Sequence, residues 1–227
     1  MLLAIDTATQ TLGLALYDGT TLIAEQTLYI GNQHSDVLAP MVEMLLTRAE
    51  ITMDDLSMIA ATRGPGIYRH LRVGIALAKG LAVGANLPLI GINTLDIIAA
   101  SQTFTNSRHR LFCVLQGTRQ TIIAGEYRVK KGRWQPIGEA VITTWDDLFT
   151  DLNKTLYYIA GEIDDRCYDA INSFEEQDNI ALTLVDPIRR HRRTGFLAQL
   201  AWQRYHAGDA ATFVPDAFDP IYLNLLD

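Results

Sequence analysis

The chain has 227 residues, of which 48% are hydrophobic, and its formal net charge at pH 7 is −7. This length and apolar content indicate a globular protein with one large domain or two small ones, and they exclude a disordered chain. An acidic protein is not drawn to nucleic acid by its overall field, so any contact with RNA needs a local basic patch or a partner. No apolar run reaches the roughly 18 residues of a membrane span.

The N-terminus and the cysteines bear on the cellular compartment. Residues 1–6 lack a basic region and reach Asp6 early, so we expect a first strand and not a signal peptide. Cys113 and Cys167 lie far apart and have no metal-binding spacing. We therefore expect a reduced, cytoplasmic protein whose two cysteines are small core or surface residues.

The first half of the chain is predicted to start with antiparallel strands and to continue with alternating helices and strands. The Asp18-Gly19 turn joins two strands in a hairpin, and Ser35 or Asp36 is expected to cap the first helix. In chain order we expect strands at residues 2–6, 12–17 and 21–27, a helix to residue 49, a helical turn from residue 54, a strand at 57–62, a helix at 68–85, a strand at 88–91 and a helix at 94–101. This order is the pattern of a ribonuclease-H-like lobe.

The polar segment 102–110 is expected to separate this lobe from a second one that begins in the same way. Lys131-Gly132 predicts a hairpin turn, and Thr144 is expected to cap a helix. The expected elements are strands at 111–115, 121–129, 134–142, 156–161 and 182–185, and helices at 144–152, 166–174 and 194–207. The sequence thus predicts an α/β protein with an N-terminal lobe at 1–103 and a C-terminal lobe at 104–227, whose final helix can pack back on the first lobe.

Residues 60–95 carry the densest pattern of motifs. A short apolar strand ends in Gly64-Pro65-Gly66, a helix rich in small residues follows, and Pro88 precedes a second apolar strand. A glycine-rich turn before a helix presents backbone N–H groups to an anion, as phosphate-binding loops do. The segment therefore indicates a βαβ-like unit with a phosphate-type loop at its first turn.

Several segments together resemble the TsaB (YeaZ) family. They are A-I-D-T-A-T at the start, Q-H-S-D-V-L-A-P at 33–40, R-G-P-G with L-R-V-G at 63–74, A-K-G-L-A at 78–82, P-L-I-G-I-N-T-L-D at 88–96 and P-I-Y-L at 220–223. The resemblance is close over the N-terminal half and looser over the C-terminal half. It implies the actin-like ATPase fold, with two ribonuclease-H-like lobes. It also implies a non-catalytic sister of TsaD, the subunit that attaches the threonylcarbamoyl group to tRNA.

The chain lacks the metal-binding histidine pair that the resemblance implies for the catalytic sister. There the strand–helix junction reads N-H-L-E-G-H, with two imidazoles four residues apart on one helix face. Thr94 and Ile98 stand at those two positions, and neither a hydroxyl nor a hydrocarbon replaces an imidazole as a ligand. None of the five histidines has H-x-x-x-H spacing, and His34, which matches a family position, also fits a simple helix-entry side chain. We therefore expect no catalytic residue, no metal site and no cofactor.

The resemblance extends to two phosphate loops, both of them altered. Residues 6–9 resemble the first phosphate loop of actin-like ATPases, although an aspartate and two threonines equally satisfy a tight turn. The second loop departs from the family's G-P-G-S-F-T-G-L-R, because Ile67, Arg69 and His70 replace small residues and obstruct a phosphate. In the second lobe, Gln116 and Thr118 replace the family's D-A-R. The expected nucleotide contacts are weak and degenerate, and they involve Asp6, Thr7, Thr9, Gly64 and Gly66.

The resemblance also implies a partner surface on the two helices of the N-terminal lobe, through which family members dimerise. Interior glycines of the second helix indicate a close approach, either to its own sheet or to a partner helix. One patch would then serve a homodimer of the isolated chain and a heterodimer with TsaD, and TsaE is a further implied partner. The expected contact residues are Leu38, Met41, Val42, Leu45, Leu71, Ile75 and Lys79.

The strongest basic run consists of Arg189, Arg190, Arg192 and Arg193. It fits a contact with tRNA phosphates and equally a solvated helix entrance. The expected function is that of a non-catalytic subunit that binds and activates TsaD for threonylcarbamoyl transfer to the adenosine next to the tRNA anticodon, with tRNA reached through the complex. An actin-like ATPase or small-molecule kinase is the alternative. A metallopeptidase would need a metal site that the sequence does not supply.

Overall fold

The computed structural model describes residues 1–104, 106–118, 120–150, 152, 155–175, 181–208 and 218–221. The chain divides into two compact units, of which unit 1 comprises Met1–Ile97 and Arg193–Tyr222, and unit 2 is built on Ile98–Arg192. The boundary expected after residue 103 is therefore corrected to residue 97. The last helix packs back on the first lobe, as expected, and it belongs to unit 1 because its apolar side contacts the first sheet.

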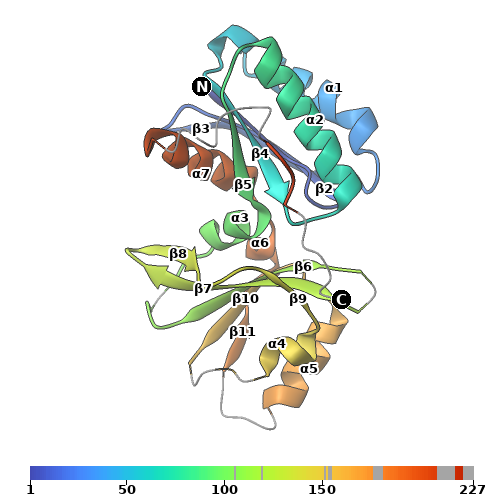
Figure 1. Ribbon diagram of the computed structural model, residues 1–227, viewed down its shortest axis with the longest axis vertical. Coiled ribbons are helices and arrows are strands. Elements are labelled where there is room, and N and C mark those ends of the chain that lie inside the picture. Colours follow the sequence, from blue (N-terminus) through green and yellow to red (C-terminus); the bar gives the residue numbers. More distant parts are fainter. Residues whose placement is uncertain are drawn as a thin grey trace. The chain divides into compact units, whose positions relative to one another are not determined.

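Unit 1 is a five-stranded sheet with the order β3-β2-β1-β4-β5 (Figure 1). β1, β2 and β3 pair antiparallel, and β1, β4 and β5 run parallel. The strands are β1 (Leu2–Asp6), β2 (Thr11–Tyr17), β3 (Leu22–Tyr29), β4 (Met58–Gly64) and β5 (Leu89–Asn93). The helices are α1 (His34–Arg48), α2 (Tyr68–Gly84), α3 (Thr94–Ala100), which crosses the unit boundary, and α7 (Thr194–His206), with a 3-10 turn at Met53–Asp55.

Two apolar cores cover the opposite faces of this sheet. Successive side chains of a strand point to opposite faces, and β1 is buried on both. Leu3 and Ile5 lie in the core under α1 and α2, whereas Leu2 and Ala4 lie in the core with Leu197 of α7. Figure 1 shows the same division, with α1 and α2 on one face and α7 on the other.

Unit 2 is a six-stranded sheet with the order β11-β10-β6-β7-β8, and β9 also pairs with β7. β6 and β7 are antiparallel, while β6, β10 and β11 run parallel. Its strands are β6 (Arg110–Gln116), β7 (Ile122–Lys130), β8 (Arg133–Pro136), β9 (Val141–Thr143), β10 (Tyr157–Gly161) and β11 (Leu182–Leu184). Its helices are α4 (Trp145–Phe149), α5 (Asp165–Glu175) and α6 (Pro187–Arg190).

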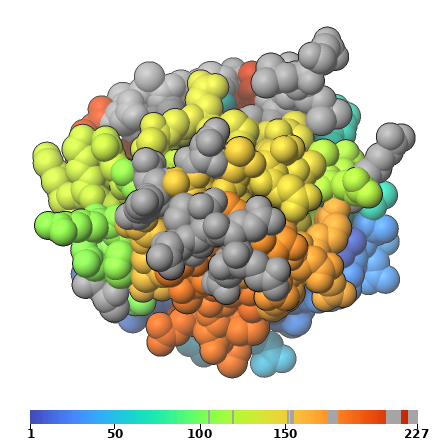
Figure 2. Space-filling view, turned by 90° about the horizontal axis from the view of Figure 1, so that it is seen from below, coloured from blue at the N-terminus to red at the C-terminus, as the bar shows by residue number. Residues whose placement is uncertain are grey.

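The core of unit 2 lies between its sheet and the helices α4 and α5. Phe112 and Val114 of β6 pack there with Trp145 and Phe149 of α4 and with Ile171 of α5. Figure 2 shows this unit from below, with the yellow segment that carries α4 beside the orange segment that carries α5. Within the described ranges, no helix is long and apolar enough to cross a membrane.

The hairpin turns and one of the expected caps are confirmed. Asp18 Oδ1 accepts hydrogen bonds from the backbone N–H groups of Thr20 and Thr21, which closes the first turn. Lys131 and Gly132 both have positive φ, as a type I′ turn requires. Thr144 accepts a hydrogen bond from the backbone N–H of Asp147 and so caps α4.

Two local expectations are wrong. The single strand expected at 134–142 is two strands, because β8 ends at Pro136, which has no N–H to donate, and pairing with β7 resumes only at Val141 in β9. Neither Ser35 nor Asp36 caps α1, because the helix already begins at His34, and Gln33 precedes it without a side-chain cap bond.

Candidate functional site

The two candidate phosphate loops of unit 1 contact each other directly. The backbone N–H of Ile67 donates a hydrogen bond of 2.7 Å to the carbonyl oxygen of Ala8. A Cβ atom on Gly66 would lie 2.3 Å from that oxygen, so only glycine permits the approach. The loops are therefore packed together where a phosphate site would need open space.

The polar side chains of the first loop point into unit 1. Asp6 Oδ1 accepts hydrogen bonds from the backbone N–H of Ala8 (3.0 Å) and from Thr62 Oγ1 (2.9 Å). Asp6, Thr7 and Thr9 have exposed fractions of 3%, 2% and 5%. The structure thus brings these predicted site residues close to Gly66, but it leaves their polar groups little access to a ligand.

The second loop is covered on its other side by a C-terminal segment. The backbone N–H of Ile221 donates to the carbonyl oxygen of Arg63 (2.7 Å), and Arg63 Nε donates to the carbonyl oxygen of Asp219 (2.8 Å). Phe218 lies in the unit 1 core, with the Arg63 guanidinium 5.6 Å from its ring centroid. A Cβ atom on Gly64, which has φ +110°, would meet the carbonyl oxygen of Ile221 at 2.7 Å. The chain's own backbone therefore occupies this side of the glycine loop.

Two histidines meet beside these loops, although they are far apart in the sequence. His34 begins α1 and His70 lies in the first turn of α2. Their rings stack with centroids 4.0 Å apart and an angle of 21° between the planes, and only 1% and 2% of the residues are exposed. Ring nitrogens bind metals in the ring plane, and two nearly parallel rings direct their lone pairs along separate lines. The stack is therefore a packing contact and not a chelating pair.

The surroundings of the stack disfavour a proton on either ring. Burial lowers the pKa of His34, and the neighbouring His70 lowers it further, while backbone groups of Thr9 and Thr11 and the charge of Asp6 partly oppose the shift. Burial likewise lowers the pKa of His70; the Thr9 backbone opposes this shift, and the cationic Arg69 adds to it. Both imidazoles are thus held neutral. Sequence reasoning missed the pair, and the only signal for it was that His70 replaces a small residue of the family loop.

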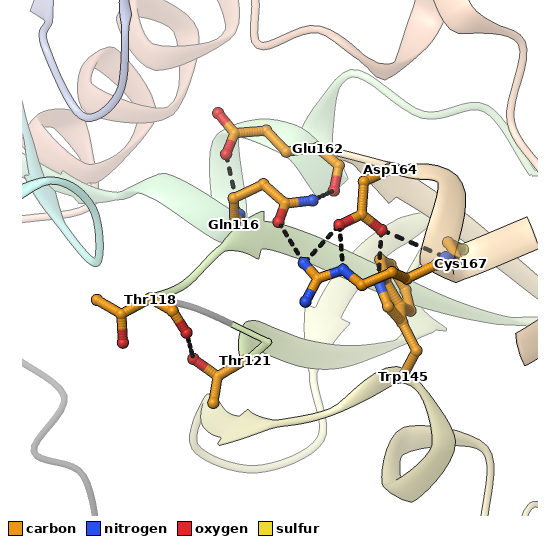
Figure 3. A network of polar contacts seen from close by, with 8 residues as sticks. Gln116, Thr118, Thr121, Trp145, Glu162, Asp164 and Cys167 are labelled. Carbon is orange, nitrogen blue, oxygen red and sulfur yellow. Dashed lines mark hydrogen bonds and ion pairs between the residues drawn. The ribbon is translucent and has the colours of Figure 1, made fainter.

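Unit 2 carries a polar network at the corresponding ends of its parallel strands (Figure 3). Gln116 at the end of β6 donates its backbone N–H to Glu162 Oε2 (2.9 Å), and its side chain accepts from Arg166 Nη2 (3.1 Å). Arg166 Nε donates a hydrogen bond to Asp164 Oδ2 (2.7 Å), and the indole N–H of Trp145 donates to the other oxygen of the same carboxylate. Partial burial would raise the pKa of Asp164, but Arg166 and Trp145 lower it below its usual value. Gln116 thus fills the position of the family's aspartate as an interior bridging group.

Cys167 borders this network and is fully buried. Burial raises the pKa of its thiol to about 12, and the nearby Asp164 carboxylate contributes. Because the thiolate is the reactive form, native Cys167 is expected to resist iodoacetamide at pH 8, whereas the chain in 6 M guanidinium reacts at both cysteines. Peptide mass spectrometry reads out the two sites separately. Rapid native labelling of Cys167 at pH 8 would contradict this assignment.

The junction at Thr94 and Ile98, where the resemblance implies a metal-binding histidine pair for the catalytic sister, is apolar and closed in this chain. Thr94 and Ile98 are both 0% exposed, and Thr94 Oγ1 has no hydrogen-bond partner. Among the residues that the structure describes, no group of three His, Cys, Asp or Glu side chains is placed to hold a metal ion.

The expected partner-contact side chains need correction. Six of the seven lie in the core of unit 1, because the apolar stripe of each helix faces the sheet; they are Leu38, Met41, Val42, Leu45, Leu71 and Ile75. Lys79 is half-buried. The outer side of α2 instead exposes Ala76, Gly80, Val83 and Gly84.

The basic run is also only partly available to RNA. Arg192 is 7% exposed and pairs with Glu162 at 3.7 Å, and Arg193 pairs with Glu25 at 2.7 Å. Arg190 Nε donates to the carbonyl oxygen of Val185 (2.6 Å), whereas Arg189 is exposed. The run mainly anchors local structure, and contact with RNA stays a prediction for its exposed members.

The chain is similar to known proteins over most of its length. Residues 28–171 match the model of the family TsaD: tRNA N6-adenosine threonylcarbamoyltransferase. The tRNA threonylcarbamoyladenosine biosynthesis protein TsaB of Bacillus subtilis (strain 168) is 30% identical over 167 residues, which are 71% of each chain. The protein of the same name from Escherichia coli (strain K12) is 35% identical over 134 residues, 59% of this chain and 58% of that protein. The structure called YeaZ from Pseudomonas aeruginosa superposes with a TM-score of 0.78 at 22% identity, covering 98% of this chain and 99% of that one.

Each sheet combines antiparallel strands at one side with parallel strands at the other, and helices pack on both faces of the first sheet and on one face of the second. This arrangement, repeated in two units, defines a two-lobed α/β protein of the actin-like ATPase fold. The extent and identity of the sequence match then fix the family. The chain belongs to the TsaB (YeaZ) family.

Proposed function

We propose that this chain is a non-catalytic subunit that binds a TsaD homologue and activates threonylcarbamoyl transfer to the adenosine next to the tRNA anticodon. TsaE is the further partner, tRNA is reached through the complex, and the isolated chain forms a homodimer in the cytoplasm. The proposal rests on family membership and on the lack of a metal-binding histidine pair among the described residues.

The observation that carries the proposal is the closed junction at Thr94 and Ile98. A transferase of the catalytic sister's kind needs two imidazole nitrogens at these positions, and here a hydroxyl and a hydrocarbon are buried instead. Without both ligand nitrogens the site cannot hold a divalent ion. Loss of a group that only hydrogen-bonds to a metal ligand already lowers metal affinity by about 10- to 100-fold.

The packed loops argue against independent ATP turnover. Phosphate binding needs several backbone and hydroxyl donors that converge on accessible space. Here Asp6, Thr7 and Thr9 are buried, and Gly66 touches the Ala8 carbonyl oxygen. The loops therefore support a structural role, in which they fix the N-terminal ends of α1 and α2.

The outer side of α2 supports a docking role. Ala76, Gly80 and Gly84 follow one another at intervals of four residues, and no heavy atom lies within 4 Å of the Cβ position of Gly80 or Gly84. An exposed interior glycine costs a helix about 0.5–1 kcal/mol relative to alanine, so the unfilled space suits a closely approaching partner. Val83, 64% exposed, adds apolar area beside it.

The test is reconstitution with a purified TsaD homologue, TsaE, tRNA and a threonylcarbamoyl donor. We expect no modified adenosine from this chain alone, little from TsaD alone, and at least about tenfold more from the mixture. Titration calorimetry of the isolated chain with ATP and Mg²⁺ serves as the control, and no saturable heat is expected below millimolar ATP.

Two results would contradict the proposal. Modified adenosine formed by this chain alone would make it a transferase. Rapid ATP turnover by the isolated chain would support the actin-like ATPase or kinase instead.

A further inference from the structure

We propose that His34 and His70 form a proton-sensitive latch between the N-terminal ends of α1 and α2. The latch is closed while both imidazoles are neutral and opens when either gains a proton. Its existence depends only on unit 1, whereas its effect on a partner rests on the proposed function.

The contacts of His70 define its neutral tautomer. Its Nδ1 lies 3.0 Å from the carbonyl oxygen of Thr9, which can only accept, so Nδ1 carries the hydrogen. Its Nε2 then accepts a hydrogen bond from Arg69 Nε at 3.3 Å. Arg69 also donates through Nη2 to Asn32 Oδ1. The neutral ring thus ties α2 to the first loop and holds the Arg69 side chain at the same time.

A proton on His70 reverses one of these contacts. Nε2 would become a donor and would face the donor group of Arg69, so the two could no longer bond. The new N–H would instead point to Asn32 Oδ1, which lies 3.2 Å away and also accepts from Arg69 Nη2. Protonation therefore breaks the bond from Arg69 Nε to the ring and places two cations in contact.

A proton on His34 is opposed more strongly than it is favoured. Neither ring nitrogen of His34 makes a hydrogen bond in the structure, and the residue is 1% exposed. The backbone groups of Thr9 and Thr11 and the charge of Asp6 favour the proton, but burial and the neighbouring His70 outweigh them. The cation would be buried, would stack on a second imidazole, and would sit at the positive end of the α1 dipole. Relief requires separation of the two helix ends.

The charged groups around the stack come from three elements. β1 contributes Asp6, which favours a proton on His34 but accepts hydrogen bonds from Ala8 and Thr62. α2 contributes Arg69, which opposes a proton on His70, and α1 contributes Asp36 in its first turn, an exposed residue. The negative charge of Asp6 is thus already bonded to other groups, whereas the positive charge of Arg69 is in contact with the His70 ring.

The sign of the pH effect follows from the lowered pKa values. The unfolded chain binds protons at histidine with a pKa of about 6.5, while the folded chain does not until lower pH. The stability that the two neutral imidazoles contribute is therefore fully present above pH 6.5. It is lost as the pH falls from 6.5 toward the pKa values of the two histidines in the folded chain. Within that window each histidine changes the unfolding equilibrium constant by at most about tenfold per pH unit.

The experiment compares urea unfolding of the full-length chain at pH 8.0, 6.5 and 5.5. The test variant is His34→Phe, which keeps a stacking ring and sacrifices no hydrogen bond. The control is His191→Asn, an exposed histidine of unit 2. We expect the wild type and the control to lose stability steeply below pH 6.5, by up to about 100-fold per pH unit in the unfolding constant, and His34→Phe to lose at most about tenfold.

The same profiles can overturn the latch. If His34→Phe and the wild type follow one pH curve, the stack does not control stability and the proposal is wrong. TsaD binding at pH 8.0 and 5.5 is measured in parallel, with loss at pH 5.5 expected for the wild type and retention for His34→Phe. Absence of binding at pH 8.0 would refute the proposed function instead, and the unfolding curves would still decide the latch.

Discussion

Gly66→Ala is expected to lower the free energy of unfolding by about 2–3 kcal/mol, a typical cost of overpacking. The added methyl group would lie 2.3 Å from the Ala8 carbonyl oxygen, a rigid backbone atom. The two loops would have to separate, which would weaken the hydrogen bond from Ile67 and loosen the neighbouring Thr9 contact of His70. Urea unfolding at pH 8.0, with unchanged slope, measures the effect.

Gly80→Ala is the matched control, because it makes the same chemical change in the same unit. Gly80 lies inside α2 and nothing approaches its Cβ position within 4 Å. Alanine there should raise the free energy of unfolding by about 0.5–1 kcal/mol through helix propensity. If Gly66→Ala unfolded at the wild-type urea concentration, the loop contact would not contribute to stability.

Ile75→Glu is expected to destabilise the chain by at least about 3 kcal/mol, whereas Ala76→Glu should change stability by less than about 0.5 kcal/mol. The two positions are adjacent in α2, but they lie about 100° apart around the helix axis, so only Ile75 faces the core. Ile75 is 5% exposed in the core, and Ala76 lies at the surface. Thermal unfolding of both variants tests the burial directly.

The same two variants distinguish an effect on folding from an effect on partner binding. On the proposed docking surface, Ala76→Glu should weaken TsaD binding by at least about 100-fold while the melting temperature stays within a few degrees of the wild type. Calorimetric titration with TsaD gives the affinity. Unchanged affinity for a folded Ala76→Glu variant would place the docking surface elsewhere.

Much of unit 1 could be predicted from local pattern. The βαβ order around Gly64 and the turn at Asp18 have strong local signals, and the structure shows both elements. The break between β8 and β9 had a local signal in Pro136 and Gly138, residue types that are depleted in strands, whereas the partner registers on β7 are set by tertiary pairing.

The candidate site was predicted less well, for two physical reasons. The resemblance implies a partner surface on the two helices of unit 1, but helical periodicity does not say whether a sheet or a partner covers an apolar stripe, and Leu71 and Ile75 lie in the core. Long-range contacts such as the stack of His34 and His70 depend on where two helices begin in space. Likewise, a basic run in sequence does not reveal that Arg192 is buried against Glu162.

The interrupted course of unit 1 has a consequence for biosynthesis. Its sheet is encoded before residue 98, but α7 and Phe218, which complete its two cores, emerge from the ribosome only after the whole of 98–192. At about 5–20 residues per second, the nascent first sheet waits several seconds with one face uncovered. The sheet and helices of the inserted unit are all encoded within 98–192, so they can meanwhile finish folding first.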